Sequence, residues 1–386
     1  MGLRIVGTDI NPAAPAFALA DVQVLASTRD TSHTVSALIA RKSEFALDGV
    51  VTMANDVPKT VAAVAEAFNL PGWKVEVAER FSNKLEMKQC FLDTGVPTPA
   101  FFAVHNPRQL KKYHQDFLES SAAVIKPIDG RGALGVRQLG PGVNYDDEYA
   151  RAREHSESDV VLLERFISGR QYSAESIITE DRMVTAGLSV RNYSRLEEFH
   201  PFIIEDGGDM QNDYPHELES EASDVVRRAA ESLGVDTGIV KADLVTDQKG
   251  QLSVIELAGR LSGGWFASHQ IPHATGINLM EAAIRISLGL EPPDSLLRKS
   301  KNRAVSTRYW FPPAGEIVSI KGIDELSGKD GVIHYEIFRG VGEIQPSIQK
   351  HSDRFGFVIC EGPTAEEAIE RVESAISCVS VEVVPQ

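Results

Sequence analysis

The chain has 386 residues, and at roughly 150 residues per domain this length allows two or three domains with a sizeable core. Apolar residues (42%) and charged residues (24%) are in globular proportions, which excludes a disordered chain, and no apolar run approaches the roughly 18 residues that span a bilayer. The 39 basic and 55 acidic side chains give a formal net charge of −16, which would repel a polyphosphate backbone. We therefore expect neither a nucleic acid nor a membrane as partner.

Three cysteines, Cys90, Cys360 and Cys378, are scattered along the chain without metal-ligand spacing. An odd number without a pattern is typical of a reducing compartment and not of a disulfide framework. The N-terminal residues also lack the apolar segment of a signal peptide. These features predict a cytoplasmic protein.

The first 80 residues alternate short β-type runs with amphipathic segments. The predicted elements are strands at Arg4–Gly7, Val22–Ala26 and Gly49–Thr52, and helices at Ser32–Lys42 and Val57–Phe68. This alternation predicts a small parallel α/β layer over residues 1–82. Parallel nucleotide-type sheets usually open one strand earlier, so we expect this layer to be truncated at its front.

The rest of the chain indicates a central domain over residues 83–292 and a last domain over residues 293–386. Ser82 is the expected N-cap of a helix that runs to about Asp93 and holds Lys84 in its first turn. Pro292-Pro293 is the expected linker into the last domain. The other predicted elements are strands at Val240–Val245 and Leu252–Leu257 and helices within Asp146–Ser158, Glu217–Leu233, Leu279–Leu288 and Glu366–Ser377.

A glycine-rich segment follows a β-type run that contains Lys126. Gly130, Gly132 and Gly135 match G-x-G-x-x-G, but the run Val136–Leu139 after them is short and β-type, whereas a dinucleotide fingerprint requires a helix there. Strand, glycine loop and strand predict an antiparallel flap, which can lay backbone N–H groups over a triphosphate while Lys126 adds a charge. An ordinary glycine-rich hairpin with a solvated lysine stays open as the alternative.

A second predicted hairpin places two carboxylates together. Two β-runs flank a Lys-Gly turn at 249–250, and either a two-residue or a four-residue loop there pairs Asp243 with Glu256 on one face and Leu244 with Ile255 on the other. Opposed positions have Cβ atoms about 4.5–5.5 Å apart, where like charges repel, so we expect something positive between them. Carboxylates are ligands that Mg²⁺ prefers, and Mg²⁺ is commonly shared with substrate phosphates. A solvated acidic edge is the alternative, and a one-residue slip would separate the pair.

Arg260 follows Glu256 by four residues along an extended stretch, on the same side of the strand and beside Ser262-Gly263-Gly264. An arginine there can hold a transferring phosphate or a substrate carboxylate through two hydrogen bonds. Consecutive small residues let backbone N–H groups approach an anion. The alternative is a turn with a surface arginine.

Taken in order, these segments resemble the ATP-grasp superfamily of carboxylate–amine ligases. The matching segments are Lys84, the Val-Ile-Lys126-Pro run, the loop Gly130–Gly135, the stretch Glu164–Gly169, Asp243, and Glu256–Gly264. Two regions are similar to the L-amino acid (dipeptide) ligase-like branch of this superfamily. They are Gly263-Gly264-Trp265 leading into Ile271–Gly276, and Arg354-Phe-Gly356 near the C-terminus. The resemblance implies an α/β protein with the α+β ATP-grasp fold: a parallel N-terminal layer, an antiparallel core sheet with a flap at about 121–180, and a C-terminal α+β domain.

Family roles transfer to this chain as implications of the resemblance. The ATP-binding residues would be Lys84, Lys126, Gly130, Arg131, Gly132, Ala133, Gly135, Glu164, Arg165, Phe166, Ile167 and Gln171. Lys84 and Lys126 would contact the phosphates, and Glu164–Ile167 would offer backbone groups to adenine. Asp243 and Glu256 would hold Mg²⁺ (or Mn²⁺), and Arg260 would be the catalytic residue that steadies the acyl phosphate. The substrate-binding residues would be Ser262, Gly263, Gly264 and His269.

Two departures from the family pattern lie in this set. Gln171 stands where the family often has a glutamate for the ribose hydroxyls, although an amide can still hydrogen-bond to them. Ala258 stands where many members have an asparagine, which removes one metal or phosphate ligand.

The implied reaction joins a small-molecule carboxylate to an amine. ATP phosphorylates the carboxylate, and the amine attacks the acyl phosphate with release of ADP and phosphate. His269 or His273 could take the amine proton, and a packed structural histidine is the alternative. Substrate choice is expected to lie in Leu188–Pro215, where Arg191 and Arg195 hint at an anionic substrate, and around Trp265–His273.

Three further questions stay open at this point. Other ATP-grasp chemistry, of the carboxylase, carbamoyl-phosphate or purine-synthesis type, would share the ATP residues. A nonenzymatic ATP-binding subunit is a second alternative. A homodimer is also allowed.

Overall fold

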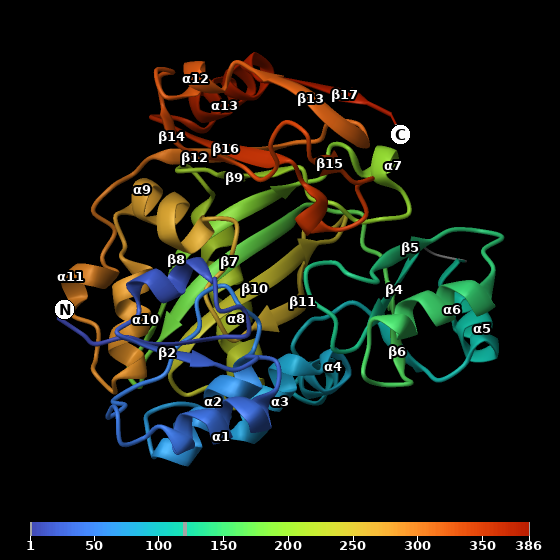
Figure 1. The fold of residues 1–386 in the computed structure, drawn as a ribbon. Coiled ribbons are helices and arrows are strands. Elements are labelled where there is room, and N and C mark those ends of the chain that lie inside the picture. The colour runs from blue at the N-terminus through green and yellow to red at the C-terminus, as the bar shows by residue number, and fades with distance from the viewer. Residues whose placement is uncertain (1, 119–121, 386) are drawn as a thin grey trace.

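A central antiparallel sheet organises the computed structural model, which describes residues 2–118 and 122–385 (Figure 1). Its eight strands run in the order β11-β10-β7-β8-β9-β12-β16-β14. Their bounds are β7 (Gln171–Ile178), β8 (Met183–Asn192), β9 (Gly207–Met210), β10 (Gly238–Thr246), β11 (Leu252–Ala258), β12 (Ala304–Trp310), β14 (Val332–Ile337) and β16 (Gly356–Gly362). The strands predicted at 240–245 and 252–257 are therefore confirmed.

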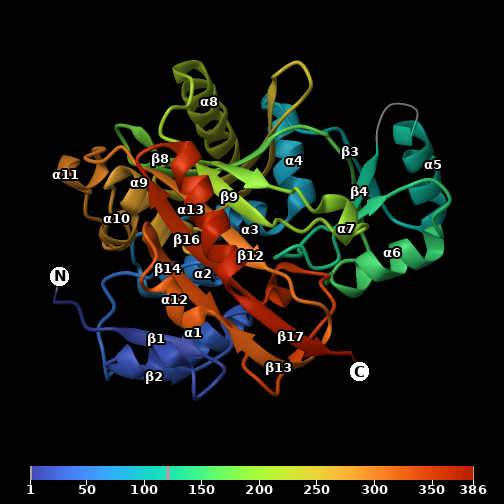
Figure 2. The same cartoon turned by 90° about the horizontal axis from the view of Figure 1, so that it is seen from above.

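Side chains on this sheet alternate between an apolar face and a polar face, as the strand period of two requires. On β10, Ala242 and Leu244 pack in the core with α8 (His216–Leu233) and α4 (Lys84–Asp93). Lys241 and Asp243 lie on the other face. Figure 2 shows α8 and the strand pair β1 (Val6–Asp9) and β2 (Val22–Leu25) on opposite sides of the sheet.

The N-terminal layer is a small parallel α/β unit, as predicted. Strands β1 (Val6–Asp9) and β2 (Val22–Leu25) pair in parallel. The segment predicted as a strand at 49–52 forms none. Gly49 lies against the end of α10 (Leu279–Ser287), where a Cβ on it would stand 2.3 Å from the Ser287 carbonyl oxygen. The helical elements of this layer are η1 (Pro15–Leu19), α1 (Thr31–Ala40), α2 (Pro58–Phe68) and α3 (Val75–Ser82). The sequence pattern predicted α1 and α2 but neither η1 nor α3.

The helix that carries Lys84 has a different N-cap from the predicted one. Ser82 is the last residue of α3, and its hydroxyl donates to the Ala78 carbonyl. The Asn83 side chain caps α4 instead, accepting from the backbone N–H groups of Leu85 (3.0 Å) and Glu86 (3.3 Å). Lys84 is thereby placed at the first helical position.

The flap belongs to a separate four-stranded sheet of order β3-β6-β4-β5. Strands β4 (Ala123–Pro127) and β5 (Arg137–Leu139) are antiparallel, with Ala123 opposite Leu139, so the strand–loop–strand flap is confirmed. The other elements of this subdomain are β3 (Phe101–Val104), β6 (Val161–Arg165), α5 (Pro107–Leu118) and α6 (Tyr145–Glu154).

The C-terminal segment adds three strands to the central sheet, which therefore continues across the boundary expected at residue 293. A further three-stranded sheet of order β15-β13-β17 is made by β13 (Gly315–Lys321), β15 (Ile344–Gln345) and β17 (Ser380–Val384). The remaining helices are α7 (Leu196–Phe199), the π-helical turn η2 (Phe266–Gln270), α9 (Ile271–Thr275), α10 (Leu279–Ser287), α11 (Asp294–Leu297), α12 (Ile323–Leu326), η3 (His351–Asp353) and α13 (Ala365–Cys378).

The three cysteines are free thiols, as expected from their spacing. Within the described part of the chain, no helix combines the length and the apolar character needed to cross a bilayer.

We expect Asn83→Ala to lower the free energy of unfolding by about 1 kcal/mol, because two backbone N–H groups at the start of α4 lose their acceptor. Urea denaturation followed by circular dichroism measures the change. Asn83→Ser is the matched control, since a serine hydroxyl can cap the same turn, and equal stability of the alanine and serine variants would contradict this role for Asn83.

Candidate active site

Asp243 and Glu256 lie opposite each other on β10 and β11, as predicted. The register shifts immediately after Asp243, so Leu244 faces Val254, and the predicted Leu244–Ile255 pair is wrong. The cause is a β-bulge, in which Ile255 is the extra residue on β11. A bulge re-aims side chains locally and is common beside functional sites.

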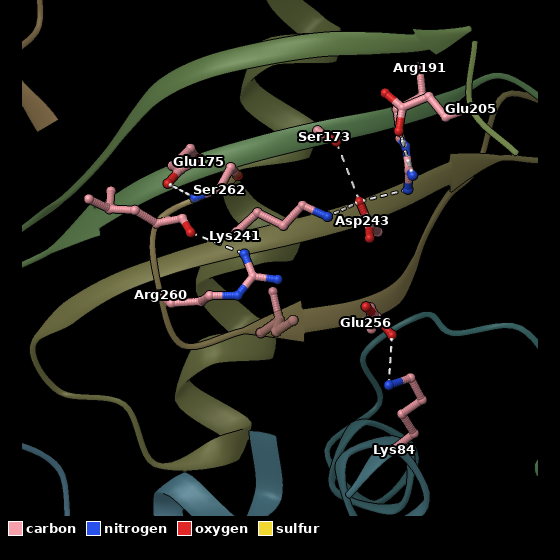
Figure 3. A network of polar contacts seen from close by, with 12 residues as sticks. Lys84, Ser173, Glu175, Arg191, Glu205, Lys241, Asp243, Glu256, Arg260 and Ser262 are labelled. Atoms are coloured by element: carbon pink, nitrogen blue, oxygen red, sulfur yellow. Dashed lines mark hydrogen bonds and ion pairs between the residues drawn. The ribbon is translucent and has the colours of Figure 1, made fainter. Parts of the chain in front are cut away.

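Positive side chains surround Asp243, which is 7% exposed. Its Oδ1 lies 3.0 Å from an Arg191 guanidinium nitrogen and also accepts from the Lys241 ammonium group, while the Ser173 hydroxyl stands at 3.4 Å (Figure 3). Burial raises the pKa of Asp243, but Arg191 and Lys241 outweigh it and hold the pKa well below its usual value. The carboxylate is therefore ionised at neutral pH.

Glu256 is linked to the flap through Lys84. The Lys84 Nζ lies 3.4 Å from Glu256 Oε2 and donates to the Gly130 carbonyl at 2.6 Å, so α4, the hairpin and the glycine loop meet at one ammonium group. Burial raises the pKa of Glu256 and Asp243 raises it further, but Lys84, Lys126 and Lys241 together bring the pKa below its usual value. Both carboxylates are therefore charged. The positive groups that the sequence led us to expect beside them are two lysines, Lys84 and Lys241, and one arginine, Arg191.

Lys126 shares a buried carboxylate with a second lysine. Its Nζ lies 2.8 Å from Glu164 Oε1, and the Lys88 ammonium group pairs with the other oxygen of Glu164. Burial lowers the pKa of Lys88 to about 8 despite Glu164. Burial raises the pKa of Glu164, but the two lysines bring it below its usual value. Glu164 therefore fixes the position of Lys126 through its side chain, and sequence reasoning missed Lys88.

Arg260 and the small-residue loop lie beside the hairpin. One Arg260 guanidinium nitrogen donates to the Leu261 carbonyl at 3.0 Å, and its Nε stands 3.8 Å from Asp56 in the N-terminal layer. The backbone N–H of Ser262 donates to Glu175 at 2.8 Å. Glu175 on β7 is fully buried, and this burial raises its pKa to about 7, although its bond with Ser262 opposes the shift. Glu175 therefore anchors the start of the Ser262-Gly263-Gly264 loop.

These groups line one cavity of about 420 Å³. Eight basic side chains and three carboxylates lie in its wall: Lys84, Lys126, Arg131, Arg165, Arg191, Lys241, Arg260 and Arg354, with Glu205, Asp243 and Glu256. The excess of positive charge in this wall is opposite in sign to the net charge of the chain, which is −16. The cavity is built to receive a polyanion.

Most residues singled out from the sequence border this cavity. Besides those already named, they are Gly130, Gly132, Ala133, Phe166, Ile167, Gln171, Ser262, Gly263 and Gly264. Gly135 packs instead against Pro127 and His155. Glu164 is turned toward its two lysines.

The two histidines considered as proton acceptors are not in the cavity wall. The π-helical turn places His269 against His334 on β14, with ring centroids 4.5 Å apart. His273 pairs with Glu361, its Nδ1 lying 3.1 Å from the carboxylate. Arg195 also points elsewhere, in an ion pair with Glu198.

Several residues in the wall were missed by sequence reasoning. Lys241 could have been found, because it precedes Asp243 by two residues on one strand and so shares its face. Tyr309, His351 and Arg354 come from the C-terminal segment, and no local pattern connects them to the hairpin. Burial lowers the pKa of His351 well below its usual value, and nearby Arg354 adds to that effect.

Comparisons with known proteins agree with this geometry. A family model of the ATP-grasp domain matches residues 81–264, and a model described as L-amino acid ligase C-terminal domain 2 matches residues 308–384. The D-alanine--D-alanine ligase of Bordetella avium is 23% identical over 245 residues, which cover 58% of this chain and 72% of that protein.

Two solved structures have a similar fold. The L-amino acid ligase from Bacillus licheniformis superposes with a TM-score of 0.83 at 22% identity, covering 100% of this chain and 93% of that one. Phosphoribosylglycinamide synthetase from Anaerococcus prevotii superposes with a TM-score of 0.74 at 18% identity, covering 99% and 94%.

We expect Glu175→Gln to become more stable relative to the natural protein as the pH rises. The folded state holds the Glu175 proton up to about pH 7, whereas an exposed glutamate loses it near pH 4.3. Between these two pH values the free energy of unfolding of the natural protein falls by up to about 1.4 kcal/mol per pH unit, whereas Glu175→Gln has no such decrease. Chemical denaturation of both proteins between pH 5 and 8 measures the difference, and parallel stability curves would contradict it.

Proposed function

We propose that this chain, which belongs to the ATP-grasp carboxylate–amine ligases and carries an L-amino acid ligase C-terminal domain, uses ATP to join two amino acids through an amide bond. The observation that carries the proposal is the pair of ionised carboxylates, Asp243 and Glu256, in the wall of a positively charged cavity. A protein that only bound ATP would need the lysines and the flap but not the carboxylate pair. The presence of Asp243, Glu256 and Arg260 together therefore supports chemistry at the terminal phosphate of ATP.

The carboxylate pair fits a hard divalent cation. Both groups offer oxygen ligands, and Mg²⁺ is commonly held by one or two carboxylates together with substrate phosphates and water. The described residues include no cluster of three or more His, Cys, Asp or Glu side chains placed to hold a metal. We infer that Asp243 and Glu256 hold Mg²⁺, or Mn²⁺, which accepts the same ligands. Such an ion would offset charge on the transferring phosphoryl group.

The basic side chains orient the nucleotide. Glu164 holds Lys126, and the Gly130 carbonyl in the glycine loop holds Lys84. Phosphate oxygens could bind either ammonium group beside these partners or in their place. The wall residues Arg165, Phe166, Ile167 and Gln171 would take the adenosine end. Closure of the flap would exclude water and protect an acyl phosphate from hydrolysis.

Arg260 and the loop after it would serve the carboxylate substrate. The guanidinium can hold the carboxylate and then the acyl phosphate that it becomes, offsetting charge in the transition state. Glu175 holds the Ser262 end of the loop, so Ser262, Gly263 and Gly264 are ready for an anion without reorganising. No side-chain nucleophile is required, because the amine attacks the acyl phosphate directly.

Amino acids are the proposed substrates because the C-terminal model match and the most similar fold reported above both come from L-amino acid ligases. An assay of ADP release also tests the two alternatives, the carboxylase type of chemistry and a nonenzymatic ATP-binding subunit. Bicarbonate-dependent ADP release would indicate the former. Nucleotide binding without ADP release from any substrate would indicate the latter.

We expect Glu256→Gln to reduce turnover at least 100-fold, because the change removes one of the two charged oxygen ligands of the metal. The assay monitors Mg²⁺-dependent ADP release and hydroxamate formation, with the protein amino acids as carboxylates and hydroxylamine as the amine. The Mg²⁺ concentration that gives half-maximal rate should rise in any residual activity.

Glu382→Gln is the matched control, since Glu382 lies on β17 outside the cavity wall and the substitution makes the same chemical change. Circular dichroism and the melting temperature should show that both variants fold. Unchanged ADP release by folded Glu256→Gln would contradict the metal assignment.

A further inference from the structure

The cavity extends past the carboxylate pair to a second group of polar side chains from the C-terminal segment. We call Thr307, Tyr309, His351 and Arg354 the C-terminal wall; all four line the cavity. Thr307 and Tyr309 lie on β12, His351 lies in η3, and Arg354 follows η3 directly. No step described above uses any of them.

Arg354 is a buried cation, and no carboxylate in the described part of the chain lies within hydrogen-bond distance of it. It is 8% exposed, and its Nη2 donates to the Glu205 main-chain carbonyl at 2.5 Å. Glu205 Oε2 stands 3.9 Å from that nitrogen and is already held by Arg191 at 2.8 Å and 3.2 Å. The Arg354 guanidinium lies over the Tyr309 ring at 3.8 Å. A buried charge in such surroundings is stabilised by an anion that the protein itself does not supply.

Unpartnered polar atoms cluster on the same wall. Within the described residues, Thr307 Oγ1, His351 Nε2 and Arg354 Nε are buried and have no hydrogen-bond partner. Buried polar atoms are nearly always hydrogen-bonded, so three orphaned atoms bordering one cavity point to a polar ligand. Arg260 Nε and Ser262 Oγ, on the reacting side of this cavity, are orphaned in the same way.

The segment that carries His351 and Arg354 is held in place before any ligand binds. The Asp353 carboxylate accepts from the backbone N–H groups of Gln349 and Lys350, both at 3.0 Å. The fully buried Gln345 amide donates to the Asp353 carbonyl at 2.8 Å, and Arg339 donates to the Arg354 carbonyl at 2.7 Å. Donors that are already fixed bind an anion without the loss of conformational entropy that ordering a loop would cause.

The C-terminal wall is near the reacting groups but separate from them. Arg191 contacts both Asp243 and Glu205, whereas Arg354 contacts the Glu205 main-chain carbonyl and, among the described residues, forms no ion pair with Asp243 or Glu256. Tyr309 reaches the substrate loop, since a Cβ placed on Gly264 would stand 3.2 Å from its hydroxyl. Because Arg260 and the loop after it are assigned to the carboxylate that is phosphorylated, a group bound by Arg354 in the same cavity would be a different one.

We propose that the C-terminal wall binds a second substrate carboxylate, which stays free during the reaction. This inference rests on the proposed ligase function. The carboxylate is either the α-carboxylate of the amine-donating amino acid or an acidic side chain on the activated one. Arg354 supplies two-point recognition of a planar carboxylate, and Tyr309 and Thr307 add hydroxyl donors.

Two comparisons test the source of this carboxylate. In the first, amino acids and their α-amides compete as amine donors, and the natural protein should favour the free acids at least 10-fold in kcat/KM. In the second, aspartate and glutamate compete with asparagine and glutamine as activated substrates, with hydroxylamine as the amine. Arg354→Gln should abolish whichever preference the natural protein shows, chiefly by raising KM, and leave the KM for ATP within about 2-fold.

Arg371→Gln is the matched control, because Arg371 lies in the same C-terminal segment, pairs with Asp330 and is outside the cavity wall. It should keep the preference. Arg354→Lys should restore part of it. If Arg354→Gln does not fold, Tyr309→Phe keeps the ring under the guanidinium and removes only the hydroxyl, and it should weaken the same preference. A natural protein without either preference, or folded variants that retain it, would overturn the proposal.

A binding measurement separates this inference from the ligase function. At saturating MgADP, malonate should raise the melting temperature of the natural protein and of Arg371→Gln but not of Arg354→Gln, and neutral malonamide should raise none. This result would support the anion site even if no carboxylate gave ADP release, an outcome that would contradict the ligase function alone. Equal malonate shifts in all three proteins, or none in any, would overturn the site.

Discussion

Asp243 and Glu256 carry like charges on opposed positions of two adjacent strands, and this repulsion is the constraint that arranges the rest of the site. Lys84, Lys241 and Arg191 offset it, and each comes from a different element: α4, β10 and β8. The helix cap at Asn83, the flap contact of Lys84 and the Arg191–Glu205 pair all follow from the need to hold those cations in place. The same cations make the cavity attractive to phosphates and carboxylates once the substrates enter.

Local patterns in the sequence were enough to predict the parts of the site that lie on one hairpin or one loop. Strand alternation and a glycine turn predicted the Asp243–Glu256 pair, and strand–glycine–strand predicted the flap. The bulge at Ile255 was not predictable, because the alternation of apolar and polar residues does not show that one strand has an extra residue. The opposed pair was nevertheless right because two deviations cancel: the turn between Asp247 and Gln251 holds three residues, a length between the two that were considered, and the extra residue Ile255 restores the expected register at Asp243.

The residues that were missed are held by partners far along the chain. Lys88 looks like an ordinary helix lysine until β6 brings Glu164 beside it. Arg354 looks like a turn arginine until β12 and β16 join the central sheet and place it over Tyr309. In both cases the signal is a buried charge, which only the three-dimensional packing reveals. The strand predicted at Gly49–Thr52 was also wrong, since Val50 packs in the core of the N-terminal layer and Gly49 lies close to the Ser287 carbonyl.

The continuity of the central sheet determines which parts of the molecule can move. Backbone hydrogen bonds join β9 to β12 and β12 to β16, so the C-terminal segment belongs to the same continuous sheet as β10, the strand that carries Asp243. Among the described residues the four-stranded flap sheet forms no strand ladder with the central sheet, and its β5 meets only the loop at Phe202 through an isolated bridge, so we expect the flap sheet to be the part that moves. Engineers wishing to exchange the C-terminal segment between enzymes would therefore have to match a strand edge at β9, and would not be replacing an independent module.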